Sequence, residues 1–337
     1  MPTAAMSPHE KLILSLSRTI DEVIRPLLGE ARVFALLDFP NHPNVGDAAI
    51  WLGEKASLRR MGRTVGYACD ETFSSTAELQ WRLKDGIILL TGGGNLGDVW
   101  PARQHWREEV IAAFPDKKIL QLPQTIYFTE KANVERAKGV FDRHPDLTIL
   151  VRDHRSLDFA RNEFRARSVL CPDMAFALGA LRRPEEPGES IVWVSRSDKE
   201  STGQSLPPLG QGVDLTDWME DNPSAYPLVD KCLTRLFYRH PSTFRRLSGV
   251  FPKVYDRFAK QRVRRGCRLL SRGRVVITDR LHGHILGLLL GIPHVILDNS
   301  YGKLRTFYET WTKGCGLAVW ADSPAEALAA AEGLKKT

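Results

Sequence analysis

The most informative segment of the chain is Val275–Lys303, VVITDRLHGHILGLLLGIPHVILDNSYGK. Its β-branched start predicts a strand that ends at Thr278, and the small and apolar residues from Leu281 predict a helix. A second apolar run, Pro293–Leu297, predicts the next strand. A strand, a helix and a strand in this order are typical of a parallel sheet with crossover helices, so the segment predicts an α/β fold.

Polar residues directly follow these strands. Arg280 and His282 lie between the first strand and the first turn of the helix, and Asn299 and Lys303 follow the second strand. A guanidinium, an imidazole and a helix N-terminus suit a doubly charged anion beside a group that titrates near neutrality. A structural role for His282 stays the alternative. His284 lies two positions on, where a helix would turn it away, so we expect no metal pair.

Similar apolar runs recur through the first half of the chain and are separated by stretches long enough for helices. This alternation predicts a parallel sheet there too. The segment LRRPEEPGES, with two prolines and a charge cluster, reads as an interdomain linker. We therefore expect a first domain at residues 1–180, a linker at 181–190 and a second domain at 191–337. The predicted strands of the first domain lie near residues 32–39, 64–68, 86–91, 118–122, 147–152 and 167–170.

The composition is that of a folded protein. The 337 residues are 43% hydrophobic and 26% charged, which excludes a disordered chain and a lone small module. The longest uncharged apolar stretch, Leu281–Leu297, is interrupted by histidines, glycines and a proline, so we expect no transmembrane helix. The N-terminal apolar core LILSL is too short for a secretory leader, and the five cysteines form no CxxC pair. We expect a cytoplasmic protein with reduced thiols.

The positive charge is concentrated in one segment, residues 231–274. It holds fourteen Lys or Arg and one acid, Asp256, so it carries +13 while the whole chain carries +7. Leu, Phe, Tyr and Val alternate with the cations, a composition suited to an anionic membrane surface. A solvated helical face and a nucleic-acid-binding surface are the alternatives.

A first motif, NHPNVGDAAIWLGE, spans Asn41–Glu54 after the first predicted strand. Asn44, Gly46 and Asp47 lie where the loop becomes a helix, so backbone N–H groups and small side chains can face a ligand. The alternative is a plain strand-to-helix turn with Asp47 as the N-cap.

A second motif, TGGGNLGDVW, spans Thr91–Trp100 and matches G-x-G-x-x-G. The next strand ends KKILQLPQT without the acid that would bind a ribose, and no GK[ST] follows, so neither a dinucleotide site nor a P-loop is predicted. What remains is a glycine-rich loop that another molecule can approach closely, with Asn95 and Asp98 as its polar tips.

Three shorter motifs, LPQT, VRD and CPDMAF, follow later strands. Arg152 of VRD ends a strand, where its guanidinium can bind a carboxylate or phosphate; a salt bridge to Asp153 or to a partner on a helix is the alternative. Asp153 itself is a candidate helix cap. Asp173 of CPDMAF either lies beside the cleft or caps a turn.

These blocks, in this order, resemble the hallmark segments of the polysaccharide pyruvyltransferase family. The likeness spans about residues 41–315, with NVGDAAIWLG, GGGNLGD, LPQT, VRD, the PD of CPDMAF and TDRLHGHILGLLLGIP. It implies a fold similar to the glycosyltransferase-B enzymes, with two Rossmann-like domains facing a cleft. It also implies transfer of the pyruvyl group of phosphoenolpyruvate onto two hydroxyls of a sugar, which forms a cyclic ketal and releases phosphate.

The resemblance implies that phosphoenolpyruvate is the donor substrate, with no cofactor or metal. His282, as proton donor, and Arg280 are the expected catalytic residues. The expected donor-binding residues are Arg152, Arg280, Leu281 through its backbone, His282, Lys303 and Asn299. The expected acceptor-binding residues are Asn44, Asp47, Asn95, Asp98 and Asp173, with Asp47 or Asp98 as base for the hydroxyl.

The expected acceptor is a sugar or a lipid-linked oligosaccharide of a bacterial exopolysaccharide. The protein would then work at the inner face of the plasma membrane, docked through residues 231–274, without binding specific nucleic acid. Two other functions stay open. One is a sugar-nucleotide-dependent glycosyltransferase of the same fold, and the other is a nucleic-acid-binding protein without enzyme activity.

Overall fold

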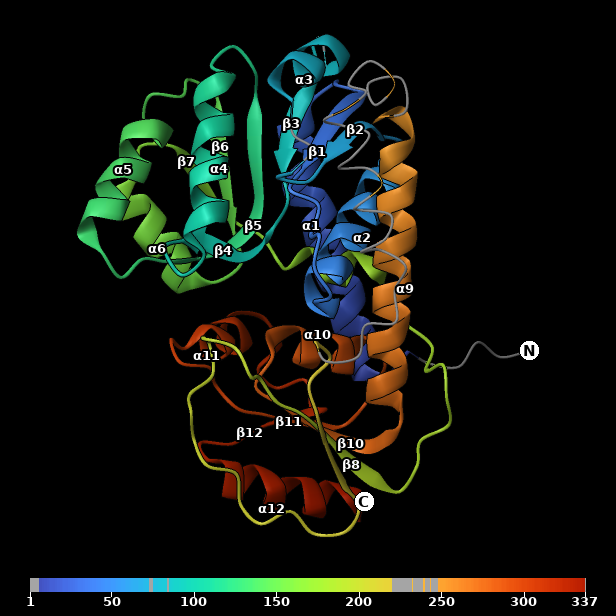
Figure 1. Cartoon of the computed structure of the whole chain (residues 1–337). Helices are drawn as coiled ribbons and strands as arrows, with labels where there is room; N and C mark the ends of the chain where they lie inside the picture. The colour runs from blue at the N-terminus through green and yellow to red at the C-terminus, as the bar shows by residue number, and fades with distance from the viewer. Residues whose placement is uncertain are drawn as a thin grey trace.

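Two separate parallel sheets organise the chain (Figure 1). The computed structural model describes residues 6–72, 75–83, 85–219 and 248–336, together with residues 232, 239 and 243. Most of residues 231–247, the first part of the predicted basic segment, lies outside the described residues. The predicted α/β fold with two sheets is confirmed, and the predicted domain boundaries stay a prediction.

The first sheet has the strand order β2-β1-β3-β5-β6-β7, and β4 pairs with the second half of β5. Its central strands are buried along their whole length, as expected of a parallel sheet covered on both faces. The strands are β1 (Val33–Leu37), β2 (Thr64–Cys69), β3 (Ile87–Leu90), β4 (Gly93–Gly97), β5 (Ile119–Tyr127), β6 (Leu147–Val151) and β7 (Arg167–Leu170). The accompanying helices are α2 (Val45–Arg60), α3 (Thr76–Leu83), α4 (Pro101–Ala113), α5 (Lys131–Phe141), α6 (His154–Glu163) and the 3-10 turn η1 (Met174–Leu178).

The second sheet has the order β12-β11-β10-β8-β9, again with all strand pairs parallel. Its strands are β8 (Ser190–Val194), β9 (Val213–Thr216), β10 (Gly273–Thr278), β11 (His294–Ile296) and β12 (Ala318–Trp320). The described helices of this half are α9 (Phe251–Ser271), α10 (Leu281–Leu289), α11 (Lys303–Phe307) and α12 (Pro324–Lys335), with the short turns η2 (Ser248–Val250) and η3 (Tyr308–Thr312).

Helices from both halves join the two sheets. Every residue of α10 is buried, because the helix lies between the sheets and contacts α1 (Pro8–Leu28), α2 and η1. In Figure 1, α9 runs along one side of the molecule from the lower body to the upper one. It packs on α2 so closely that a Cβ at Gly266 would lie 2.3 Å from Val45 Cγ1. The cleft between the sheets is therefore closed on one side by packed helices.

Several elements were not predicted from sequence. Helix α1 begins with a capping box at Ser7 and Glu10, two residues whose spacing matches the S-x-x-E pattern. Part of the glycine-rich loop forms β4, and β9 lies in a stretch for which no strand was predicted. Strand β12 is short and half-buried, so its hydrophobic signal is weak. No helix among the described residues is long and apolar enough to span a membrane.

Candidate active site

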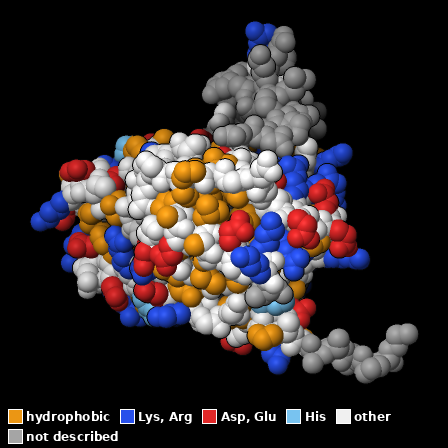
Figure 2. Space-filling view, turned by 90° about the horizontal axis from the view of Figure 1, so that it is seen from below, with side chains coloured by type: hydrophobic (Ala, Val, Ile, Leu, Met, Phe, Trp, Pro, Cys, Tyr) orange, Lys and Arg blue, Asp and Glu red, His pale blue; other side chains and the backbone are white. Residues whose placement is uncertain are grey.

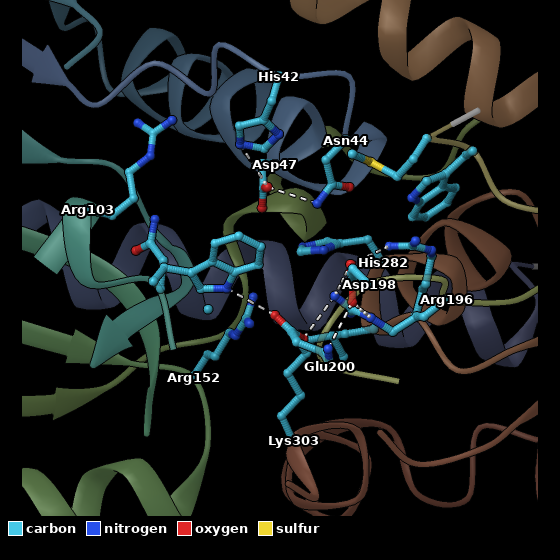
Figure 3. Close-up of a pocket in the computed structure, with 17 residues that line it drawn as sticks. His42, Asn44, Asp47, Arg103, Arg152, Arg196, Asp198, Glu200, His282 and Lys303 are labelled. Atoms are coloured by element: carbon cyan, nitrogen blue, oxygen red, sulfur yellow. Dashed lines mark hydrogen bonds and ion pairs between the residues drawn. The ribbon is translucent and has the colours of Figure 1, made fainter. Parts of the chain in front are cut away.

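A pocket with about 1020 Å³ of empty space, open to solvent, lies between the two sheets at the carboxyl ends of their strands. Two helices, α2 and α10, begin at this pocket, so their N-terminal backbone dipoles favour an anion there. Figure 3 shows His42, Asn44 and Asp47 on one wall, with His282 between this wall and Arg196, Asp198 and Glu200. The seventeen lining residues are His42, Asn44, Asp47, Gly94, Asn95, Trp100, Arg103, Arg152, Arg196, Asp198, Glu200, Trp218, Met219, Arg280, Leu281, His282 and Lys303.

His282 lies in the first turn of α10 and against the first turn of α2. A Cβ at Gly46 would lie 2.3 Å from His282 Nδ1, so only a glycine at position 46 leaves room for this imidazole. On the other side of the ring, Nε2 lies 3.3 Å from Asp173 Oδ2. The structure thus fixes the histidine between a helix start and a carboxylate.

Asp173 is fully buried behind His282 and makes three polar contacts. It accepts hydrogen bonds from the Ala175 N–H, which caps η1, and from Arg152 Nη1 at 2.6 Å. Burial alone would raise the pKa of Asp173, but His282 and Arg152 hold it well below its usual range. The turn-cap role is observed, and Asp173 lies behind His282, a residue that lines the pocket. Asp173 contacts His282 and does not line the pocket.

Arg152 follows β6 and is buried, with only its outer edge on the pocket. Its Nε donates to Thr125 Oγ1 at 2.9 Å and Nη1 donates to Asp173. The remaining nitrogen, Nη2, faces Gly94, where a Cβ would lie 2.9 Å away. The alternative of a salt bridge to Asp153 is wrong, since Asp153 caps α6 by accepting the Ser156 N–H, as the sequence predicted.

Arg280 contacts two carboxylates that were not predicted from the sequence. Its Nη2 donates to Asp217 at 2.6 Å, and Nη1 lies 3.9 Å from Asp198 Oδ2. The guanidinium also lies over the Trp218 ring, 5.7 Å from its centroid. Asp217 and Trp218 follow β9, a strand that sequence reasoning missed.

The loop after β8, with the sequence RSDKE, supplies further charged groups to the pocket. Arg196 pairs with Asp198 at 2.9 Å and with Glu200 at 3.0 Å. Glu200 also accepts from Lys303; burial would raise the pKa of Glu200, but Lys303 and Arg196 lower it to about 2. Burial lowers the pKa of Lys303 to about 8, against the effect of Glu200. The apolar run of β8 directly before this loop was the signal that could have identified it.

The wall that faces His282 is built at the start of α2. Asn44, and not Asp47, is the N-cap, because its side-chain oxygen accepts the Gly46 N–H at 3.0 Å. Asn44 Nδ2 donates to Asp47 Oδ2 at 2.9 Å, and His42 Nε2 lies 3.5 Å from the same oxygen. Loss of solvation lowers the pKa of His42 below its ordinary value, against the raising effect of Asp47. A largely neutral imidazole beside a carboxylate is an arrangement that accepts protons.

The structure brings together most of the predicted site residues, and three lie off the pocket surface. Asp98 accepts from the backbone N–H groups of Thr129 and Glu130 at the start of α5, and so faces away from the pocket. Asn299 supports Lys303 by accepting its backbone N–H at 3.0 Å. The third residue, Asp173, lies behind His282. The lining residues that were predicted are Asn44, Asp47, Asn95, Arg152, Arg280, Leu281, His282 and Lys303.

The glycine-rich motif serves the site differently from the expectation. The N–H groups of Gly92 and Asn95 donate to the buried side chains of Glu54 and Gln124, so they are not available to a phosphate. At Gly97 the backbone φ is +138°, and a Cβ would lie 1.8 Å from the Tyr127 carbonyl oxygen, so only glycine fits. The motif therefore shapes the pocket wall and lets Gly94 lie against Arg152.

His282 and His284 contact different groups. His284 is fully buried, and its ring nitrogens lie 2.7 Å from His294 Nε2 and 2.9 Å from Thr312 Oγ1. Burial lowers the pKa of His284 well below its ordinary value. Within the described residues, no group of three His, Cys, Asp or Glu side chains is arranged to hold a metal ion.

Known proteins are similar to this chain, two in sequence and one in fold. "Pyruvyl transferase 1" of Schizosaccharomyces pombe is 33% identical over 309 residues, covering 87% of this chain and 74% of that protein. "Putative pyruvyl transferase EpsO" of Bacillus subtilis is 31% identical over 282 residues, covering 82% of this chain and 84% of that protein. The crystal structure of an uncharacterized protein from Klebsiella pneumoniae has a TM-score of 0.57 at 18% identity and covers 91% of this chain and 99% of its own, which shows the shared fold.

The chain also matches a protein family over most of its length. Residues 44–301 match the family described as polysaccharide pyruvyl transferase. This span includes Asn44 and Asp47 on one wall of the pocket and Arg152, Arg280 and His282 on the other. The chain is an enzyme of the polysaccharide pyruvyl transferase family.

Proposed function

We propose that the enzyme transfers the pyruvyl group of phosphoenolpyruvate onto two hydroxyls of one sugar, forming a cyclic ketal and releasing phosphate. The observation that carries this proposal is the convergence of Arg152, Arg280 and Lys303 with His282 at two helix N-termini. A carboxylate and a phosphate on one small molecule need several fixed cations. We also propose a glycosyltransferase-B-like arrangement, which the position of the pocket between two parallel sheets supports.

The donor half of the reaction begins with a proton. His282 gives a proton to the terminal CH₂ carbon of phosphoenolpyruvate, the double bond breaks, and the adjacent carbon becomes oxocarbenium-like. A sugar hydroxyl oxygen forms a bond to that carbon, the phosphate leaves with its bridging oxygen, and a second hydroxyl closes the ring. The two hydroxyl protons balance the reaction: one restores the proton that His282 gave to carbon, and the other ends on phosphate.

The cations of the site already have carboxylate partners before the donor binds. Arg280 is paired with Asp217 and Lys303 with Glu200, so their geometry is fixed in advance. Fixed donors stabilise a developing charge without the cost of reorganising solvent. Phosphoenolpyruvate is therefore recognised by cations whose positions are fixed before it binds. Arg152 Nη2, which faces the cleft at Gly94, is one of them.

The acceptor half of the reaction requires a base, and we propose His42 with Asp47. The sequence offered Asp47 as base; in the structure His42 lies beside this carboxylate and also lines the pocket. With Nε2 directed at Asp47, Nδ1 of His42 is left to accept the hydroxyl proton. Arg103 and Arg262 lower the pKa of His42 further, beyond the loss of solvation, and Asp38 raises it.

Substituting His42→Gln should lower turnover by about 10²–10⁴-fold, because one proton acceptor is lost, while the affinity for phosphoenolpyruvate stays within a few-fold. The neutral imidazole is the active form, so wild-type activity should fall as the pH drops through the lowered pKa of His42. The variant should lack this acidic limb in its pH–rate profile. His105→Gln, an exposed histidine of α4, is the matched control. An unchanged acidic limb in the His42→Gln enzyme would rule out this base.

Titration of the purified protein with phosphoenolpyruvate, alongside a panel of nucleotide sugars, tests the donor. A ligand present at a hundred times its Kd stabilises the native state by about 2.7 kcal/mol. We expect a rise in the unfolding temperature with phosphoenolpyruvate alone. Stabilisation by a nucleotide sugar and not by phosphoenolpyruvate would instead support a glycosyltransferase of the same fold.

We further propose that the acceptor is a lipid-linked oligosaccharide of an exopolysaccharide, reached at the cytoplasmic face of a membrane. The support comes from the family of the chain and from the basic residues of α9. No described helix is long and apolar enough to span a bilayer, so α9 would have to reach such an acceptor from the membrane surface.

A further inference from the structure

One face of α9 presents a line of cations. Lys253, Arg257, Lys260, Arg264 and Arg268 are all exposed and recur every three or four residues, so they share one side of the helix. We call these five residues the basic face. Within the described part of the chain, none of the five lies within ion-pair distance of a carboxylate. At about 1.5 Å per residue, the line is roughly 22 Å long.

The opposite side of α9 is packed against the protein. Phe251, Tyr255 and Leu270 are buried there, and the one acid of the helix, Asp256, turns inward to accept from Trp51 Nε1 at 3.0 Å. The charged residues of α9 are therefore not distributed evenly around the helix. The cations of the basic face point to solvent, whereas the one acid points toward the protein.

The lower surface of the molecule is different. Figure 2, seen from the side of α12 in Figure 1, shows hydrophobic side chains at the centre with acidic and basic side chains intermixed around them. Such a mixed surface has no strong attraction for an anionic partner. The line of cations on α9 differs from this mixed surface.

An exposed tryptophan lies next to an arginine that reaches the N-terminal end of α9. Trp81 of α3 is 63% exposed, and Arg82 lies over its ring at 5.1 Å. Arg82 also reaches the start of α9, since a Cβ at Gly249 would lie 3.5 Å from its Nη1, and the neighbouring Val250 is 51% exposed. Tryptophan beside arginine is typical of side chains at a membrane–water interface.

We propose that the basic face and Trp81 together dock the enzyme on the surface of a bilayer that contains anionic lipids. The line of cations attracts the lipid headgroups, and the indole enters the interface at one end of the line. Duplex nucleic acid would also attract the cations, but it offers no interface for the exposed Trp81 and Val250. The charge pattern and the apolar end together favour the bilayer.

The same helix also holds one wall of the active site. Arg262 Nη1 donates to the Pro40 carbonyl at 2.6 Å, and Arg265 Nη2 donates to the Pro43 carbonyl at 2.7 Å. The two contacted carbonyl groups lie on either side of His42 in the chain, and His42 lines the pocket. Docking through α9 would thus place the acceptor wall near the lipid surface. This last consequence rests on the proposed function, whereas the docking itself does not.

Sedimentation of the full chain with vesicles tests the docking. We expect binding to vesicles of phosphatidylcholine mixed with phosphatidylglycerol, no binding to phosphatidylcholine alone, and release by high salt. Each neutralised cation should weaken partitioning about fivefold, so the triple variant Lys253→Gln, Lys260→Gln, Arg264→Gln should lose about a hundredfold. Trp81→Ala should weaken binding further in the same assay.

A matched variant separates the basic face from net charge. Lys131→Gln, Arg143→Gln, Arg161→Gln removes the same charge from exposed positions on and near α5 and α6, on the side of the molecule away from α9 (Figure 1), and should bind vesicles almost as wild type does. Equal losses in both triple variants, or binding to duplex DNA but not to anionic vesicles, would overturn the proposal. Phosphoenolpyruvate affinity, measured in each variant, should not change. A wild type that binds vesicles but not phosphoenolpyruvate would contradict only the proposed function.

Discussion

Replacing His282 with glutamine should lower turnover by about 10²–10⁴-fold, the usual contribution of a positioned proton donor. Glutamine keeps a polar side chain of similar reach against Gly46 but cannot protonate carbon. The affinity for phosphoenolpyruvate should stay within a few-fold, because Arg152, Arg280 and Lys303 remain. Phosphate release in the presence of a glycan acceptor measures turnover, and calorimetry measures donor binding.

A second readout separates the proton donor from a phosphate ligand at His282. Loss of a proton donor lowers kcat, whereas loss of a phosphate ligand raises KM for phosphoenolpyruvate. If His282→Gln turns over normally, the proposed role is wrong. If its turnover is normal only at saturating donor, with weakened affinity, His282 binds phosphate and another group supplies the proton. The exposed His105→Gln serves as control.

Substituting Arg280→Ala should weaken phosphoenolpyruvate binding by about 2–5 kcal/mol, the cost of removing one member of a buried charge pair. That range corresponds to roughly 30-fold to several thousand-fold in Kd. The guanidinium is 2% exposed and donates to Asp217 at 2.6 Å. A lysine ammonium lacks the planar fork with which a guanidinium can contact Asp217 and phosphoenolpyruvate together. Arg280→Lys should therefore restore only part of the affinity.

Loss of the fold could mimic this result, because Arg280→Ala leaves Asp217 buried without its cation. The double variant Arg280→Ala, Asp217→Asn removes that unpaired charge and should recover thermal stability without recovering donor affinity. Recovery of affinity together with stability would show that Arg280 only maintains the fold. Unchanged affinity in the single variant would exclude Arg280 from the donor site.

Most of the sheet framework could be predicted from sequence, because buried parallel strands are continuous apolar runs. The runs that became β3 and β6 are buried along their whole length, and their signal is local. Arg152 and His282 could be predicted for a related reason, since each directly follows such a strand. Strand ends in a parallel sheet meet at one edge, so position after a strand predicts position in space.

The partners of these residues could not be predicted in the same way. His282 meets Asp173 and Arg280 meets Asp217, and each pair is separated by many residues of intervening fold. Nothing local distinguishes Asp217, which holds an arginine in the site, from Asp98, which accepts hydrogen bonds at the start of α5. The N-cap of α2 was equally hard to predict, because Asn and Asp are nearly equal in energy as N-caps. The structure has Asn44, and not Asp47, at this position.

The net charge of the chain was a poor guide to the electrostatics of the pocket. Its lining cations face Asp198, Glu200 and the carboxylates behind them, so the site is a set of prearranged pairs and not a uniformly positive cleft. The basic face lies elsewhere, on the outer side of α9, and its five cations have no carboxylate within ion-pair distance among the described residues. Donor recognition and the proposed membrane docking therefore use different arginines and lysines, and variants of one surface should leave the other unchanged.

The most direct test of pyruvyl transfer is one carbon NMR measurement on the complete reaction. The enzyme is incubated with phosphoenolpyruvate labelled at its central carbon and with a panel of hexose glycosides and oligosaccharides that present free diols. The proposed function predicts a ketal carbon signal from at least one acceptor, with one phosphate released per ketal formed. Stable phosphoenolpyruvate with every acceptor, while an added nucleotide sugar is consumed, would contradict it.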